Sequence, residues 1–172
     1  VIDTNVILAA NESHENLSPD CIATCASRLL DIKSKGTVII DDKFRILSEY
    51  QNKTDSRGGK KPGDAFLKWL LQNSANPKHC IRVALTEQGP DIFDEFPVKT
   101  LENFFDPSDR KFVAVANAHP SKPTVLQAAD CKWLDWQEDL RSAGIEIEFI
   151  CLDDVRRFYA KKFPDKPTPS GK

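Results

Sequence analysis

Short apolar runs and longer stretches of helical spacing alternate along this chain. The apolar runs predict strands within 1–10 and over 37–40, 79–85, 123–130 and 145–152. The helical spacing predicts helices over 21–35, 42–53, 65–73, 107–118, 133–143 and 153–163. Strands that alternate with helices favour parallel pairing, because parallel neighbours need a crossover connection. We therefore predict an α/β fold, a three-layer sandwich with a mostly parallel central sheet.

The chain is long enough to bury one substantial core. It has 172 residues, of which 40% are hydrophobic and 29% charged. This length favours one domain, which we assign to 1–163. Residues 164–172 are rich in proline and charge, so we expect a disordered tail. The segment 54–64 is rich in glycine and lysine and predicts an exposed loop, whereas 86–105 predicts no single element.

The charge balance argues against a general attraction to phosphate. The formal net charge is −2 and the pI is near 6.0. Contact with nucleic acid therefore needs a local basic patch or metal ions. The sequence has no apolar run near the roughly 18 residues of a membrane span, and it opens without a signal-peptide pattern. We expect a soluble cytoplasmic protein.

The cysteines follow no metal-binding or redox motif. They stand at positions 21, 25, 80, 131 and 151, without a CxxC pair or a Cys/His spacing typical of zinc. A cytosolic protein keeps such thiols reduced. We expect buried, reduced cysteines with no chemical role.

Four acidic residues stand at positions that suggest chemistry. Asp3 lies in an apolar run, where an unpaired carboxylate is costly and often marks a site. Asp130 ends the run TVLQAA, so both acids belong to the carboxyl edge of the predicted sheet, where sites form. Asp109 stands in the first turn of one predicted helix and Glu49 lies within another. We expect the four to converge.

Converging carboxylates favour divalent cations. Four anions at short distance cost several kcal/mol of repulsion unless they are protonated or bind cations. Oxygen ligands without a matching His or Cys favour Mg²⁺ or Mn²⁺ over zinc. The pattern thus predicts a site for one or two of these ions.

The ordered set of acids resembles that of the PIN domain, a nuclease family related to the 5′-nucleases. The resemblance rests on VIDTN with Asp3, SEY with Glu49, DPSDRKFVAVA with Asp109 and LQAAD with Asp130, and it spans about residues 1 to 160. In that family the acids hold one or two Mg²⁺ or Mn²⁺ ions, and the usual activity is metal-dependent cleavage of single-stranded RNA, sometimes DNA. The resemblance implies the same role for these four acids and a supporting role beside the first acid for Asn5.

The chain departs from the family pattern at two points. It is longer than the compact toxin nucleases, with additional sequence around 56–64 and 86–105. A protein antitoxin or regulator and a homodimer are therefore expectations of the resemblance only. Asp135, five residues after Asp130, is the alternative for the fourth acid.

The implied reaction is hydrolysis of a phosphodiester by metal-activated water. One ion lowers the pKa of bound water and a second, ~4 Å away, stabilises the leaving oxygen. No protein nucleophile is needed, which agrees with the lack of a Ser/His/Asp or Cys/His pattern. The basic candidates for phosphate contact are Arg57, Lys60 and Lys61 in the glycine-rich loop, and Arg110 beside Asp109.

Each candidate also has a structural interpretation. Asp109 suits a helix N-terminus, Glu49 a solvated helix face, and Asp130 the cap of the following helix; the basic loop residues suit plain solvation. An Asp-based phosphatase of the haloacid-dehalogenase type needs a second Asp where Asn5 stands. The remaining alternative is a PIN-like scaffold that has lost catalysis and binds RNA or a protein partner.

Overall fold

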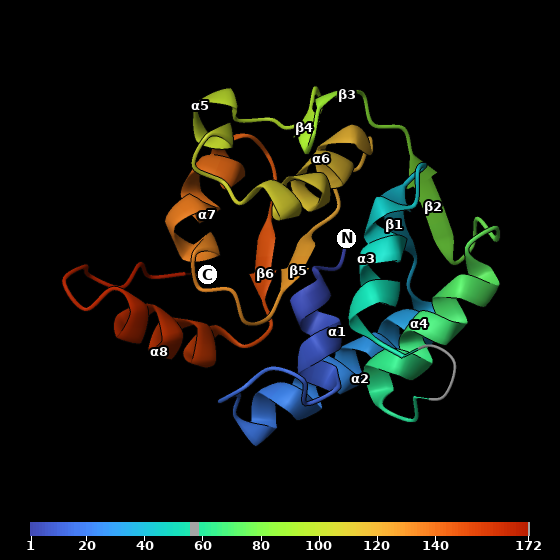
Figure 1. Cartoon of the computed structure of the whole chain (residues 1–172), viewed down its shortest axis with the longest axis horizontal. Helices are drawn as coiled ribbons and strands as arrows, with labels where there is room; N and C mark the ends of the chain where they lie inside the picture. Colours follow the sequence, from blue (N-terminus) through green and yellow to red (C-terminus); the bar gives the residue numbers. More distant parts are fainter. Residues whose placement is uncertain (56–58, 172) are drawn as a thin grey trace.

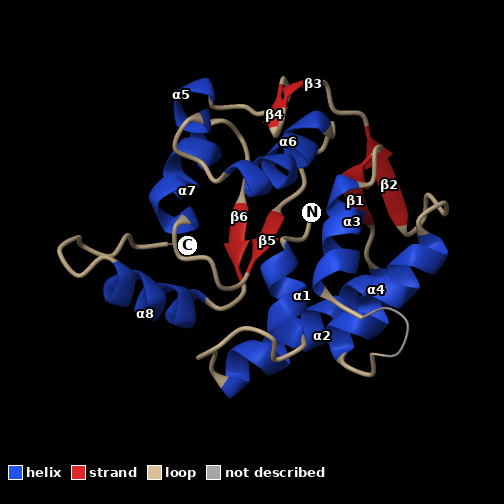
Figure 2. Ribbon diagram, in the orientation of Figure 1, coloured by secondary structure: helices blue, strands red, loops and turns tan. Residues whose placement is uncertain are grey.

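The chain folds into helices interspersed with short strands (Figures 1 and 2). The structure is a computed structural model that describes residues 1–55 and 59–171. Its elements are α1 (Thr4–Ala10), α2 (Pro19–Lys35), β1 (Val38–Asp41), α3 (Arg45–Lys53), α4 (Pro62–Asn73), β2 (Cys80–Val83), β3 (Glu87–Gly89), β4 (Ile92–Phe93), α5 (Lys99–Glu102), the 3₁₀ turn η1 (Pro107–Asp109), α6 (Arg110–Ala118), β5 (Val125–Gln127), α7 (Trp133–Ser142), β6 (Ile147–Phe149) and α8 (Leu152–Lys162). The predicted α/β class and the predicted helices are confirmed, and β3, β4 and α5 fill the unassigned segment.

The longer strand pairs are parallel. β1 pairs with β2 and β5 pairs with β6, each in parallel, whereas β3 and β4 form a small antiparallel pair. The chain start extends the β5–β6 pair, because Ile2 forms a parallel bridge with Leu126 and the Asp3 N–H donates to the Leu126 carbonyl at 2.9 Å. Residue 3 therefore leaves a strand-like segment at the same edge at which β5 ends.

The prediction that the opening apolar run continues as a strand is wrong beyond Ile2. The carboxylate of Asp3 accepts the N–H of Asn5 at 2.7 Å and caps α1, which begins at Thr4. Val6 and Ile7 are fully buried inside this helix. A short apolar run that is buried on every side carries no period that separates helix from strand.

An aromatic cluster holds α7 against the loop that precedes η1. The ring of Phe105 lies 5.0 Å from that of Trp133 and 4.2 Å from that of Trp136, measured between centroids. Trp133 and Leu140 are fully buried, as expected for a stripe of apolar residues at helical spacing. This packing sets the position of η1 relative to the start of α7.

Residues 164–171, which we expected to be disordered, run back along α8. Arg156 donates to the carbonyl oxygens of Ser170 and Gly171. A Cβ built at Gly171 would meet the side chains of Leu152 and Leu134 within 3 Å. The segment therefore contacts both α8 and α7. Among the described residues, no helix combines the length and apolarity needed to cross a membrane.

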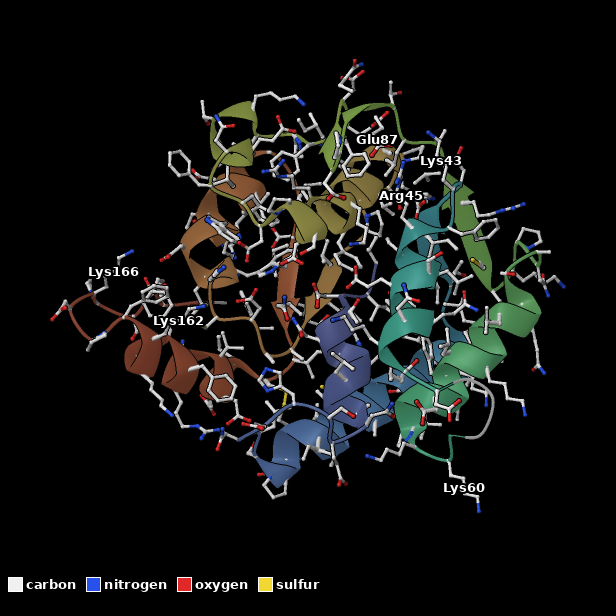
Figure 3. The ribbon with its side chains drawn as sticks, viewed as in Figure 1. Lys43, Arg45, Lys60, Glu87, Lys162 and Lys166 are labelled. Carbon is white, nitrogen blue, oxygen red and sulfur yellow. A yellow bond between two sulfur atoms is a disulfide. The ribbon has the colours of Figure 1, made fainter. Side chains whose placement is uncertain are left out.

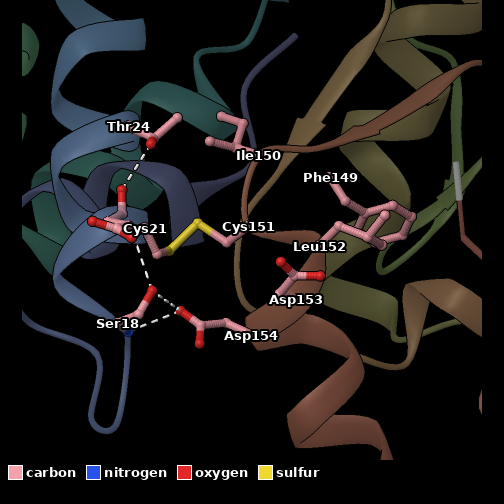
Figure 4. A pocket seen from close by; sticks show the side chains of 10 residues that line it. Ser18, Cys21, Thr24, Phe149, Ile150, Cys151, Leu152, Asp153 and Asp154 are labelled. Atoms are coloured by element: carbon pink, nitrogen blue, oxygen red, sulfur yellow. Dashed lines mark hydrogen bonds between the residues drawn. A yellow bond between two sulfur atoms is a disulfide. The ribbon is translucent and has the colours of Figure 1, made fainter.

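The expectation of reduced cysteines is wrong for two of the five. Cys21 and Cys151 form a disulfide that joins α2 to the start of α8 (Figure 4). Cys25, Cys80 and Cys131 are free and buried, as expected. A pairing across 130 residues depends on how α2 packs against the end of β6, which no local spacing reports. Because disulfides are rare in the cytosol, cytoplasmic location stays a prediction.

The disulfide closes a long loop, so its removal should destabilise the fold. We expect Cys21→Ser to lower the free energy of unfolding by about 2–5 kcal/mol, because the unfolded chain regains loop entropy. Urea unfolding of both proteins would measure this. As the control, dithiothreitol should destabilise the wild type and leave Cys21→Ser unchanged. Free thiols at both positions in a non-reducing peptide map would contradict the disulfide.

Candidate functional site

The four predicted acids lie together, although they are far apart in the sequence. Asp3 precedes α1, Glu49 lies on α3, Asp109 ends η1 and Asp130 follows β5. The charges of the other three each raise the pKa of Asp3. Figure 1 shows why: the start of α1 lies between β5 and α3, below α6. The topology thus gathers four carboxylates at the end of β5.

Asp3 is the most deeply buried member of this group. Its exposed fraction is 2%. Burial raises the pKa of Asp3 well above its ordinary value, and the charges of Asp109, Asp130 and Glu49 raise it further. The backbone N–H of Asn5 acts in the opposite direction by donating to the carboxylate. The described contact of Asn5 with the first acid is therefore made by its backbone.

Glu49 is oriented by two side chains. The hydroxyl of Thr4 donates to Glu49 Oε1 at 2.6 Å, and Lys111 Nζ lies 2.5 Å from Oε2. Lys111 is buried, and its ammonium also donates to the carbonyl of Ser108. Glu49 is thus no freely solvated helix acid, because a buried cation balances its charge.

Asp109 faces the acidic group and does not cap its helix. Its side chain makes no capping hydrogen bond to α6. Trp133 Nε1 instead donates to Asp109 Oδ2 at 3.2 Å. Burial, followed by the charge of Asp130, raises the pKa of Asp109 to about 6, although the Trp133 hydrogen bond and Lys111 lower it.

A fifth acid, Asp106, joins the group. Carboxylate oxygens of Asp106, Asp109 and Asp130 all lie within 4.8 Å of one another. Lys132 Nζ donates to both oxygens of Asp106, at 2.9 and 2.6 Å. Asp106 directly precedes η1, but its side chain makes no capping hydrogen bond there. The sequence signal that could have found Asp106 is its three-residue spacing from Asp109, because residues three apart lie on the same side of a helical turn.

Asp130, and not Asp135, belongs to the acidic group. Asp135 accepts the hydroxyl of Tyr159 at 2.5 Å and pairs with Lys166 at 4.0 Å. Asp130 Oδ1 accepts the backbone N–H of Lys132 at 3.0 Å, at the start of α7. The structural and chemical interpretations of Asp130 are therefore compatible, because the same carboxylate accepts this N–H and brings an oxygen within 4.8 Å of Asp106 and Asp109.

The predicted basic residues do not gather around the acids. Arg110 is buried and donates to the carbonyl oxygens of Phe105 and Asp91. Lys61, which directly precedes α4, donates from Nζ to the backbone carbonyl of Asn11 at 2.7 Å. Lys60 extends into solvent beyond α4 (Figure 3). Arg57 lies outside the described residues.

The arrangement carries an excess of negative charge. Five carboxylates (Asp3, Glu49, Asp106, Asp109 and Asp130) are accompanied by two ammonium groups, those of Lys111 and Lys132. Such a group either holds protons or binds cations. Comparison with protein-family models, curated proteins and solved structures finds no match to this chain, so its chemistry must be argued from these residues.

The raised pKa of Asp109 predicts a pH-dependent effect on stability. An aspartate with a folded-state pKa of about 6 binds its proton more tightly than in the unfolded chain. Its contribution to the free energy of unfolding therefore falls as pH rises from about 4 to about 6 and stays lowered above that. Without metal, we expect Asp109→Asn to raise Tm at pH 7.5 by about 3–8 °C.

The same substitution should have little effect at pH 3.5, where Asp109 is mostly protonated in the unfolded chain as well as in the folded chain. Thermal melts in a chelating buffer at the two pH values would check this. Asp139→Asn removes an exposed charge on α7 and serves as the control. Equal shifts for Asp109→Asn at both pH values would contradict the assigned pKa.

Proposed function

We propose that the chain is a PIN-like, metal-dependent nuclease that hydrolyses phosphodiester bonds in single-stranded nucleic acid, with RNA as the preferred substrate. The observation that supports this most directly is the burial of Asp3 against other carboxylates. A chain gains no stability from gathering repelling groups in a poorly hydrated place. Bound divalent cations would lower the electrostatic cost of burying these carboxylates, so the arrangement is consistent with a metal-binding site.

The donor set fits Mg²⁺ or Mn²⁺. It consists of carboxylate oxygens, which hard cations prefer. Asp106, Asp109 and Asp130 are near enough to one another to share an ion, and Asp3 and Glu49 extend the set. When bound, such ions supply activated water and stabilise the leaving oxygen.

The surrounding residues orient the acids for that role. Thr4 fixes one oxygen of Glu49, and Trp133 fixes one oxygen of Asp109. The buried Lys111 keeps Glu49 from turning toward solvent. RNA as the substrate rests on the family resemblance, because none of these contacts involves a group that would distinguish a ribose from a deoxyribose.

One observation favours the alternative of an inactive scaffold that binds RNA or a protein partner. Lys111 and Lys132 already pair with Glu49 and Asp106. Acids that are neutralised internally need no metal. Three acids nevertheless lie outside these two ion pairs, namely Asp3, Asp109 and Asp130, and they are the ones that repel one another.

Metal binding can be measured without knowing the substrate. A ligand that binds only the folded chain raises stability by RT ln(1 + [L]/Kd). We expect saturating Mn²⁺ to raise the wild-type Tm by about 5–10 °C and Asp3→Asn to lose most of this shift. Asp139→Asn is the control, because it removes an acid outside the group and should respond as the wild type does.

The same three proteins test the reaction. Fluorescently labelled single-stranded RNA and DNA should be cut by the wild type and by Asp139→Asn in Mn²⁺, and by neither in EDTA. Asp3→Asn should be at least about a hundredfold slower, since metal-site changes of this kind remove several kcal/mol of transition-state stabilisation. If Mn²⁺ does not raise the Tm of the wild type and the wild type cuts neither substrate, the nuclease proposal fails and the inactive scaffold remains.

A further inference from the structure

A pocket of about 340 Å³ opens beside the acidic group. Asp130 forms part of its wall, together with Asn5, His14, Phe158 and Lys162. This volume lies in the range of pockets that hold small ligands. Because Asp130 belongs to both the pocket and the acidic group, a molecule in the pocket would lie next to whatever the acids bind.

The far wall of the pocket combines aromatic and cationic groups. The rings of His14 and Phe158 lie 5.6 Å apart between centroids, tilted by 35°, and both are half-buried. They come from segments 144 residues apart, the loop after α1 and helix α8. Aromatic rings held in place at a pocket wall offer a surface against which a nucleobase can pack.

Lys162 supplies the positive charge. It lies at the end of α8, on the side of α7 (Figure 3). Its side chain is exposed, and within residues 1–55 and 59–171 it forms no ion pair with an acid; its ammonium lies 5.6 Å from the ring of Phe163. Lys111 and Lys132, in contrast, are both paired. Lys162 is thus left available for an external anion.

We propose that this pocket binds the nucleotide that flanks the scissile phosphate, with its base against the His14–Phe158 pair and its phosphate at Lys162. The inference rests on the proposed function, since it takes the phosphate at the acids as its reference point. It also assigns the phosphate contact to α8, instead of the glycine-rich loop that the sequence indicated. Single-stranded nucleic acid suits the pocket, because only an unstacked base can turn into it.

Binding of an oligonucleotide tests the pocket separately from catalysis. The probe is a fluorescein-labelled oligouridylate, measured in the presence of Mn²⁺. Its phosphorothioate linkages slow cleavage during the measurement. We expect Phe158→Ala to weaken binding at least about fivefold through loss of base packing. Lys162→Gln should weaken it too and should reduce the slope of log K against log salt by about 0.7, the value for one phosphate contact on a single strand.

Lys161→Gln is the matched control, because it removes an exposed lysine from the neighbouring position on α8. It should bind as the wild type does, with an unchanged salt slope. Circular dichroism and Tm would establish that each variant is folded, and Phe158→Leu replaces Phe158→Ala if the latter is not. A 4-thiouridine in the probe should crosslink to the peptide that contains Phe158 in the wild type.

The outcomes separate the two proposals. If Mn²⁺ binds and RNA is cut, but Phe158→Ala and Lys162→Gln bind the probe as the wild type does, the pocket inference is overturned and the nuclease stands. If these variants lose binding of the probe while the wild type neither binds Mn²⁺ nor cuts RNA, the pocket inference stands and the nuclease proposal does not. A wild type that fails to bind the probe overturns the pocket inference.

Discussion

Burial of the Asp3 carboxylate is the constraint on which the rest of the site depends. Removing a charge from water costs several kcal/mol unless it is paired or protonated. Among the described residues, Asp3 accepts the backbone N–H of Asn5 and forms no ion pair with a lysine, and the charges of Asp109 and Asp130 repel its carboxylate. The surrounding packing must therefore supply the energy that holds these groups together, and any ligand that neutralises them returns part of that energy.

The packing that does so is aromatic and lies behind the acids. Phe105 and Trp133 meet edge to face, and Trp133 also donates to Asp109. Arg110 donates to the carbonyl of Phe105, so the turn that carries Asp109 is tied to the core from two sides. Rigid support of this kind is what a preorganised site needs, because repelling groups would otherwise move apart.

The sequence predicted the acids better than the contacts that surround them. Asp3 stood out because a carboxylate in an apolar run has few explanations, and the four acids were selected together by a resemblance in their order along the chain. Asp106 and its partner Lys132 were missed, since their pairing joins η1 to α7 across 26 residues. The disulfide was missed for the same reason. Val6 and Ile7 were assigned to a strand because full burial removes the helical period.

Asp130 links the acidic group to the neighbouring pocket, and this sharing has a thermodynamic consequence. A phosphate approaching the pocket meets the charge of Asp130 as well as that of Lys162. A cation at the acids would cancel the first and leave the second, so it would favour the nucleotide. Coupling between binding sites is reciprocal, so the nucleotide would raise the affinity for the cation by the same factor. The lysines that pair with Glu49 and Asp106 weaken this coupling, because they already balance part of the charge.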